Sequence, residues 1–190
     1  MLATIKITYK SIAVSFFTAM LFSCTNDSKA VRDFLAEKNL PIAVAKDAYH
    51  VYKDSGRITS KLITPILNDF SNRKNHPYNE FPEGIKIINF ENNGKDSVTV
   101  IGDYALSYSK TSISELKENV VVINHTDVSR LETSQLFWDQ KNKYFFTEQE
   151  FVLMTLNDTI SGVGFESMEN LKKYVAKKTN GNILTNEDEL

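Results

Sequence analysis

Few side chains in this 190-residue sequence have the types and spacing that catalysis or metal binding requires. The three histidines, His50, His76 and His125, lie far apart, and none has a second ligand at the spacing of a known metal motif. Asp103 and Asp139 each lie beside an aromatic-rich segment, where paired carboxylates could act as general acid and base. Turn or strand-end roles explain both aspartates more simply. We therefore expect no catalytic residue, no metal site and no cofactor.

The segment Gly162-Val163-Gly164 begins like a dinucleotide-binding fingerprint. However, Ser167 stands where the third glycine would be, and no helical pattern follows. We interpret the segment as a β-bulge or a close approach of two backbones. The net charge of −2 also argues against a nucleic-acid-binding protein, which usually carries a basic face.

The only cysteine, Cys24, follows a segment typical of a secreted lipoprotein precursor. Lys6 and Lys10 precede an apolar run over residues 11–22, which is shorter than the roughly 20 residues that span a bilayer. The tetrapeptide Leu21-Phe22-Ser23-Cys24 resembles the bacterial lipobox. This resemblance implies that the leader is cut before Cys24, whose sulfur is then lipidated, for example with palmitate. The alternative is a buried core cysteine in an N-terminal helix.

These signals divide the chain into four parts. We expect a signal peptide over residues 1–23, a lipidated N-terminus and linker over 24–46, a β-domain over 47–183 and an acidic tail over 184–190. Within the linker, Asp27 or Ser28 could cap a short amphipathic helix with apolar residues at Val31, Phe34 and Leu35. A solvated spacer is the alternative for this segment.

The rest of the chain has the pattern of short β-strands. Residues 58–66 and 98–108 alternate between apolar and polar, and Ser55-Gly56 is a hairpin signal. Residues 120–123 and 151–154 are continuous apolar runs, as in strands covered on both sides. The turn signals between these segments indicate about ten mostly antiparallel strands and no long helix. The fold class is therefore all-β: a sandwich, jelly roll or barrel.

Several short segments in order resemble one known family, LptC, whose members act in lipopolysaccharide export. The resemblance covers residues 45 to 183 and rests on the segments Lys53–Ile58, Pro77–Gly84, Gly102–Ala105, Glu118–Val121, Leu131–Asp139, Tyr144 and Gly162–Phe165. It implies an open, twisted antiparallel β-jellyroll without catalytic residues. It also implies that the protein accepts lipopolysaccharide (LPS) from an LptB-LptF-LptG-like ABC transporter and passes it to an LptA-like periplasmic protein.

The location that the family implies is the periplasm. Many relatives are anchored by a transmembrane helix, whereas this chain has a lipobox. We expect a lipid anchor in the inner membrane, with the outer membrane as the alternative.

The apolar sides of the strands predict which residues face the interior of such a fold. We expect some of them to line the path of the lipid: Leu62, Ile66, Leu106, Tyr108, Val120, Val122, Leu136 and Trp138. The last strand-like segment, Tyr174–Lys178, would leave an exposed edge to which a partner could add a strand.

Three other functions are compatible with the same pattern. An LptA-like bridge belongs to the same class of protein. A structural or adhesin-like β-sandwich lipoprotein would have a closed core without a cleft. A periplasmic enzyme would need a buried carboxylate pair around Asp103 or Asp139.

Overall fold

The computed structural model describes residues 28–180 of the chain. Contacts divide the chain into two compact units, up to Phe34 and from Leu35 onward. Helix α2 (Ser28–Glu37) confirms the predicted helix, and Val31 and Phe34 are exposed on it. Two residues after the helix, Asn39 adopts the left-handed conformation that is common just beyond a helix C-terminus, with a φ of 56°.

The described residues after the helix contain eleven strands and one short 3-10 helix, η1 (Asn92–Gly94). The strands are β1 (Ala43–Asp54), β2 (Arg57–Phe70), β3 (Tyr78–Phe81), β4 (Ile85–Glu91), β5 (Asp96–Gly102), β6 (Tyr104–Tyr108), β7 (Ile113–Asn124), β8 (Arg130–Asp139), β9 (Tyr144–Met154), β10 (Thr159–Met168) and β11 (Tyr174–Asn180). The all-β class is therefore confirmed. Strand β1 begins inside the segment 24–46 that we expected to be linker, because its first residues already pair with the end of β2.

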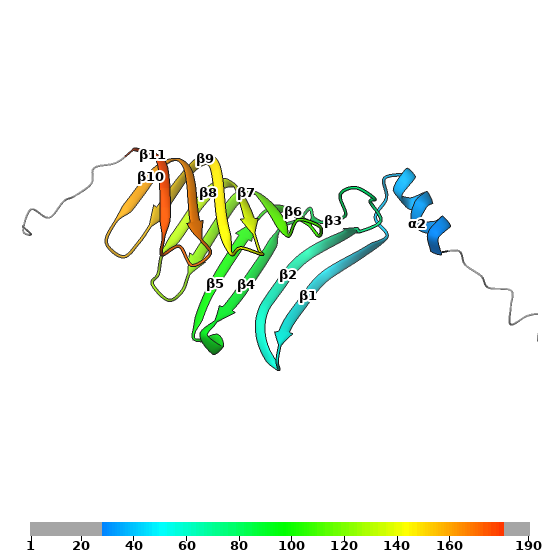
Figure 1. Ribbon diagram of the computed structural model, residues 1–190, viewed down its shortest axis with the longest axis horizontal. Coiled ribbons are helices and arrows are strands. Elements are labelled where there is room, and N and C mark those ends of the chain that lie inside the picture. The colour runs from blue at the N-terminus through cyan, green and yellow to red at the C-terminus, as the bar shows by residue number, and fades with distance from the viewer. Residues whose placement is uncertain (1–27, 181–190) are drawn as a thin grey trace, which may run out of the picture. The chain divides into compact units, whose positions relative to one another are not determined.

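All strand pairs of the sheet are antiparallel, and part of the sheet closes on itself. Strand β2 pairs with β3 through its last residues and with β4 through its middle. Strand β7 likewise pairs with both β6 and β5. Since β3 pairs with β6 and β4 with β5, the six strands form a ring, with β4 and β5 on one side and β3 and β6 on the other. Figure 1 shows β8 to β11 continuing side by side beyond β7.

Bulges let the long strands pass from one layer to the other. The register of β7 with β8 shifts between Lys117 and Val120, and that of β10 with β9 shifts between Val163 and Phe165. A β-bulge bends its strand and increases the local twist. Gly164, at the second shift, has a φ of 80°, and a Cβ at Gly162 would lie only 2.0 Å from the carbonyl oxygen of Lys178. The interpretation of these glycines as a bulge and a close backbone approach is confirmed.

The turn between β1 and β2 confirms the hairpin signal. Ser55 and Gly56 both have positive φ, 50° and 81°, as the two central residues of a type I′ turn require. The continuous apolar runs behave differently from the prediction. Val120 and Val122 are buried, but Val121 between them is only half-buried, so this strand is fully covered on one side alone.

The core is filled most completely between the C-terminal strands. Several large side chains there have no exposed surface: Leu131, Leu136, Phe145, Leu153 and Phe165. Aromatic contacts continue across the strands, with the rings of Phe151 and Phe165 4.9 Å apart. This part of the interior is therefore closely packed.

Candidate functional site

The interior of the six-strand ring contains a cleft of about 570 Å³. This volume falls in the range of roughly 300–1,000 Å³ that is typical of small-molecule sites. Strands β2, β3, β4, β6, β7 and β8 supply most of its walls. Its apolar lining includes Leu62, Leu67, Phe81, Ile85, Ile87, Phe90, Ala105, Leu116 and Trp138.

The position of each lining side chain follows from strand alternation. In β4, Ile85 and Ile87 are buried and line the cleft, while Lys86 between them is exposed. In β7, Leu116 lines the cleft and is 1% exposed. Successive side chains of a strand point to opposite faces, so one apolar face of each strand is turned into the ring. The alternation in Ile85-Lys86-Ile87 could have revealed this strand from the sequence, although we did not single it out.

Trp138 connects the lining of the cleft with the filled core. Its side chain is 4% exposed and lines the cleft, and its ring centroid lies 5.7 Å from that of Phe145. Phe145 has no exposed surface and is not part of the lining. The indole therefore adjoins both the cleft and the packed part of the interior.

Polar side chains join the two layers at the rim of the cleft. We call Asn89, Glu91, Lys143 and Glu169 the polar rim, and all four line the cleft. Lys143 Nζ lies 2.7 Å from Glu91 Oε1, and the amide of Asn89 donates a hydrogen bond to Glu169. The backbone N–H of Glu169 donates to the carbonyl oxygen of Lys143 at 2.9 Å. The rim thus connects β4 to the turns that follow β8 and β10.

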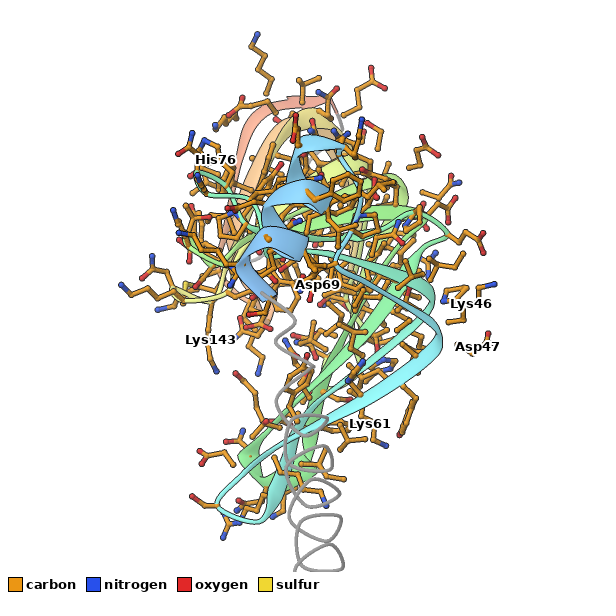
Figure 2. The ribbon with its side chains drawn as sticks, turned by 90° about the vertical axis from the view of Figure 1, so that its right-hand side faces the viewer. Lys46, Asp47, Lys61, Asp69, His76 and Lys143 are labelled. Carbon is orange, nitrogen blue, oxygen red and sulfur yellow. The ribbon has the colours of Figure 1, made fainter. Side chains whose placement is uncertain are left out.

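The pKa values of two rim side chains, Glu169 and Lys143, are shifted by different causes. Burial raises the pKa of the Glu169 carboxyl, although the Asn89 hydrogen bond opposes this shift. The hydrogen bond to Glu91 raises the pKa of Lys143. Lys61 does not belong to the rim, since its Nζ lies 5.4 Å from the centre of the Phe90 ring. In Figure 2 Lys61 and Lys143 lie on opposite sides of the view. Because Lys143 is matched by Glu91 and Glu169, the rim is not a cationic site for an anion.

A short line of polar groups also runs along one wall. The hydroxyl of Ser114 donates to Ser107 Oγ at 3.0 Å and accepts a hydrogen bond from the Gln140 amide at 3.2 Å. All three residues line the cleft. The wall is therefore apolar with a polar line, as in sites where a few polar groups orient a mostly apolar ligand.

The predicted interior residues fall into three groups. Leu62 and Trp138 line the cleft. Val120, Val122 and Leu136 are buried, at 1%, 0% and 0% exposure, in the packed core outside the cleft.

The third group, Ile66, Leu106 and Tyr108, is half-buried and does not line the cleft. In β6 the lining residues are Ala105 and Ser107, so Leu106 and Tyr108 point to the opposite face. In β2 Leu67 lines the cleft instead of Ile66, because the alternation changes phase between Leu62 and Leu67. Pro65 lies at this change, where a strand loses a hydrogen-bond donor.

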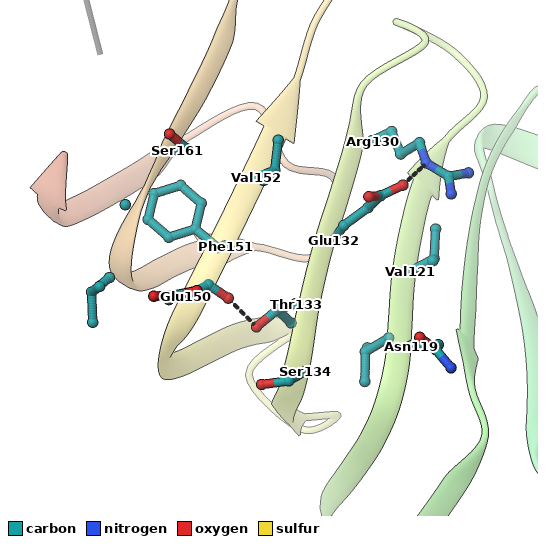
Figure 3. Close-up of a pocket in the computed structure, with 13 residues that line it drawn as sticks. Asn119, Val121, Arg130, Glu132, Thr133, Ser134, Glu150, Phe151, Val152 and Ser161 are labelled. Atoms are coloured by element: carbon teal, nitrogen blue, oxygen red, sulfur yellow. Dashed lines mark hydrogen bonds and ion pairs between the residues drawn. The ribbon is translucent and has the colours of Figure 1, made fainter. Parts of the chain in front are cut away.

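A second depression of about 720 Å³ lies where β7, β8, β9 and β10 bend. Figure 3 shows its polar residues, including the contact of Arg130 with Glu132 and the hydrogen bond from Thr133 to the carbonyl oxygen of Glu150. Arg130 and Glu132 are half-exposed and already neutralise each other. This depression is more open and more polar than the cleft, and it is less suited to an apolar ligand.

The structure does not bring the candidate catalytic residues together. Asp103 accepts a hydrogen bond from the Asn119 amide at 2.6 Å, and Asp139 accepts two from Asn142. Asp139 therefore has a lowered pKa and a turn role. His125 shares a hydrogen bond with the hydroxyl of Thr99. Within residues 28–180, no group of three or more histidine, cysteine or acidic residues could hold a metal ion.

Cys24 lies outside the described residues. Between residues 28 and 180, no helix combines the length and the apolar character needed to cross a bilayer.

A family model described as "Lipopolysaccharide-assembly, LptC-related" matches residues 13–177. The matched range contains every strand that lines the cleft and the first residues of β11. A search of curated proteins finds no match.

Proposed function

Since the chain belongs to the LptC-related family of lipopolysaccharide-assembly proteins, we propose that it carries LPS by holding acyl chains in the cleft of the six-strand ring. The family match confirms the resemblance found in the sequence. It connects the chain with LPS transport in the periplasm, in association with the inner membrane. The cleft itself is the observation on which the proposed carrier role rests.

The walls of the cleft suit hydrocarbon chains. Each methylene group that is transferred from water to an apolar site gains roughly 0.8 kcal/mol. Buried apolar side chains such as Ile85, Ile87 and Phe81 offer this environment. The volume of the cleft fits part of a lipid with several chains. The sugar and phosphate groups would remain in water beyond the polar rim.

The carrier role includes an anchor and partners at both ends. We propose that lipidated Cys24 holds the domain at the membrane, where an LptB-LptF-LptG-like ABC transporter would deliver LPS. An LptA-like protein would then receive it. Stable anchoring needs two or more acyl chains, as a diacylated and further acylated cysteine provides. The cleft argues against a purely structural or adhesin-like β-sandwich, for which a closed core is expected.

A photo-crosslinking pair on β4 tests the carrier role. A photoreactive amino acid at Ile87, which is 7% exposed and lines the cleft, should capture LPS in cells. The same group at the adjacent, exposed Lys86 should capture little, because it points to the other face. Equal capture from both positions, or capture from Lys86 alone, would contradict binding inside the cleft.

A further inference from the structure

Helix α2 carries an apolar face that is left uncovered. Ala30, Val31, Phe34 and Leu35 fall within about 140° of the helix circumference, because successive residues of an α-helix are about 100° apart. We call these four residues the apolar face. None of the ten residues of α2 is buried, and Val31 and Phe34 are 52% and 56% exposed.

A helix of this length depends on a partner for its apolar face. Helices shorter than about 12–15 residues are marginal in water, and most helical stability in proteins comes from the packing of an amphipathic face. The ends of α2 add little, since its first turn has no acidic residue and its last turn has no basic one. An exposed amphipathic helix of ten residues therefore indicates a surface against which it packs.

The position of the helix in the chain indicates which surface this is. Residues 25–27 alone separate the proposed lipid attachment at Cys24 from Ser28, where α2 begins. Four peptide steps reach at most about 14 Å, whatever conformation these residues adopt. A lipidated cysteine would therefore hold the start of the helix within this distance of the membrane surface.

We propose that α2 lies in the plane of the membrane interface, with its apolar face inserted among the acyl chains next to the headgroups. The proposal rests on the lipid anchor of the proposed function and adds a second contact with the bilayer. Interfacial helices bury their apolar side about 5–10 Å into this boundary. On its own so small a face binds weakly, but a short tether supplies it at a local concentration of about a millimolar.

The polar side of α2 predicts the kind of lipid that the helix needs. Lys29 and Arg32 are balanced by Asp33 and Glu37, so the helix has no net charge. Attraction to anionic headgroups is therefore not the driving force. The insertion should be the same in zwitterionic vesicles at low and at high salt, since salt screens charge interactions and not apolar ones.

This contact would limit how far the β-domain can move from the membrane. Residues 38–42 join the helix to Ala43, the first residue of β1, and these six peptide steps reach at most roughly 20 Å. The domain would thus start close to the bilayer from which the proposed carrier takes LPS.

Fluorescent labels on the two sides of the helix test the proposal. The sequence has no cysteine besides Cys24, whose sulfur the lipid would occupy, so an introduced cysteine is the one thiol to label. The lipidated full-length protein carrying Val31→Cys or Asp33→Cys is labelled with nitrobenzoxadiazole and reconstituted in phosphatidylcholine vesicles. We expect the label at position 31 to emit at a shorter wavelength and to be quenched by nitroxide-labelled lipid. The label at position 33, on the polar side, should emit as in water and be quenched little.

Phe34→Ser should release the helix from the interface. Serine and phenylalanine have similar helix propensities, so the change mainly removes apolar surface. The ratio of inserted to free helix, measured with the label at position 31, should fall about tenfold to a hundredfold. The matched control, Asp33→Ser on the polar side, should leave this ratio unchanged. Circular dichroism checks that the β-domain of each variant is folded.

A membrane-bound protein whose label at position 31 stays in water, or whose two labels are quenched equally, would overturn the proposal and leave the anchor intact. A label at position 31 that emits at a shorter wavelength but is not quenched by lipid would also overturn it, because protein would then cover the face. A protein that does not remain with the vesicles would contradict the lipid anchor and, with it, this proposal. The crosslinking pair on β4 tests the carrier role separately.

Discussion

The side-chain amide of Asn89 on β4 donates a hydrogen bond to the carboxylate of Glu169 in the turn between β10 and β11. This contact spans 80 positions of the sequence and joins β4 to a turn whose two flanking strands do not pair with β4. Glu169 is 8% exposed, so its charge is kept in a poorly solvated place. The Glu169 carboxyl is therefore the acceptor of the side-chain contact between β4 and this turn, and its burial affects its protonation.

Glu169 should make the protein less stable as the pH rises. Its pKa in the folded protein is raised by burial above the ordinary value of 4.5. Just above that value the unfolded chain has released the proton that the folded protein still holds, so stability falls as pH increases through this window. Glu169→Gln keeps an acceptor for Asn89 and should remove this fall. Chemical denaturation at a series of pH values measures the effect.

Glu166 is the matched control because its shift has the opposite sign. Hydrogen bonds from Lys177 and Tyr144 lower the pKa of its carboxyl in the folded protein. The stability that it adds is present above the ordinary carboxyl pKa and is lost as the pH falls through the lowered value. Glu166→Gln should therefore flatten the acid side of the profile. Identical profiles for the two variants would contradict this assignment.

The alternation of apolar and polar residues was sufficient to predict the all-β class of the fold. It did not predict correctly for every strand which side chains point into the cleft. Residues 98–108 read as one alternating strand, yet the structure divides them into β5 and β6 at Asp103. The N–H of Asp103 donates to the carbonyl of Glu118, where the chain changes layers. The inward face changes there from even to odd positions, so Tyr108 points outward while Ser107 lines the cleft. A corner of this kind depends on contacts distant in sequence.

Local signals that depend on a few residues were more reliable. Ser55-Gly56 predicted the first hairpin because both positions need positive φ. The cleft could not be predicted in this way, because it depends on where two layers fail to fill the space between them.

Gly162→Ala should destabilise the attachment of β11. An added Cβ would lie 2.0 Å from the carbonyl oxygen of Lys178, so the backbones of β10 and β11 must separate. We expect a loss of about 2–3 kcal/mol in the free energy of unfolding, as for other steric changes at buried positions. The control is Gly94→Ala. An added Cβ at Gly94 would meet nothing within 4 Å, but the φ of this residue is 84°, which is unfavourable for alanine. It should cost about 1 kcal/mol. Equal losses would mean that β11 adapts freely.

Cys24 should be the site of lipid attachment. A clickable fatty acid fed to cells should label the unaltered protein, and Cys24→Ala should remain unlabelled, because the sequence contains no other cysteine. The variant should also leave the membrane fraction, since the anchor depends on the acyl chains. A Cys24→Ala protein that is labelled as strongly as the original would refute the assignment.

The N–H groups of β11 alternate between its partner strand and its open edge. Among the described strands, β11 pairs with β10 alone. The N–H of Met168 donates to the carbonyl of Lys173 at 3.1 Å. Hydrogen-bonded and non-bonded pairs alternate in an antiparallel ladder, so the pair Glu166–Val175 is bonded and the pair Phe165–Ala176 is not. Val175 therefore directs its N–H toward β10, and Ala176 directs its N–H away from the sheet.

Because the two N–H groups point in opposite directions, proline substitutions at Val175 and Ala176 should have different effects. If an LptA-like partner adds a strand to β11, Ala176→Pro should prevent co-purification of that partner, because it removes an outward donor and leaves the β10 ladder in place. Val175→Pro should instead break a bond to β10 and lower the free energy of unfolding by roughly 1–3 kcal/mol. Circular dichroism and denaturation of both variants separate folding from docking. A folded Ala176→Pro protein that still retains the partner in full would exclude β11 as the handover edge, since strand addition cannot proceed without that row of donors.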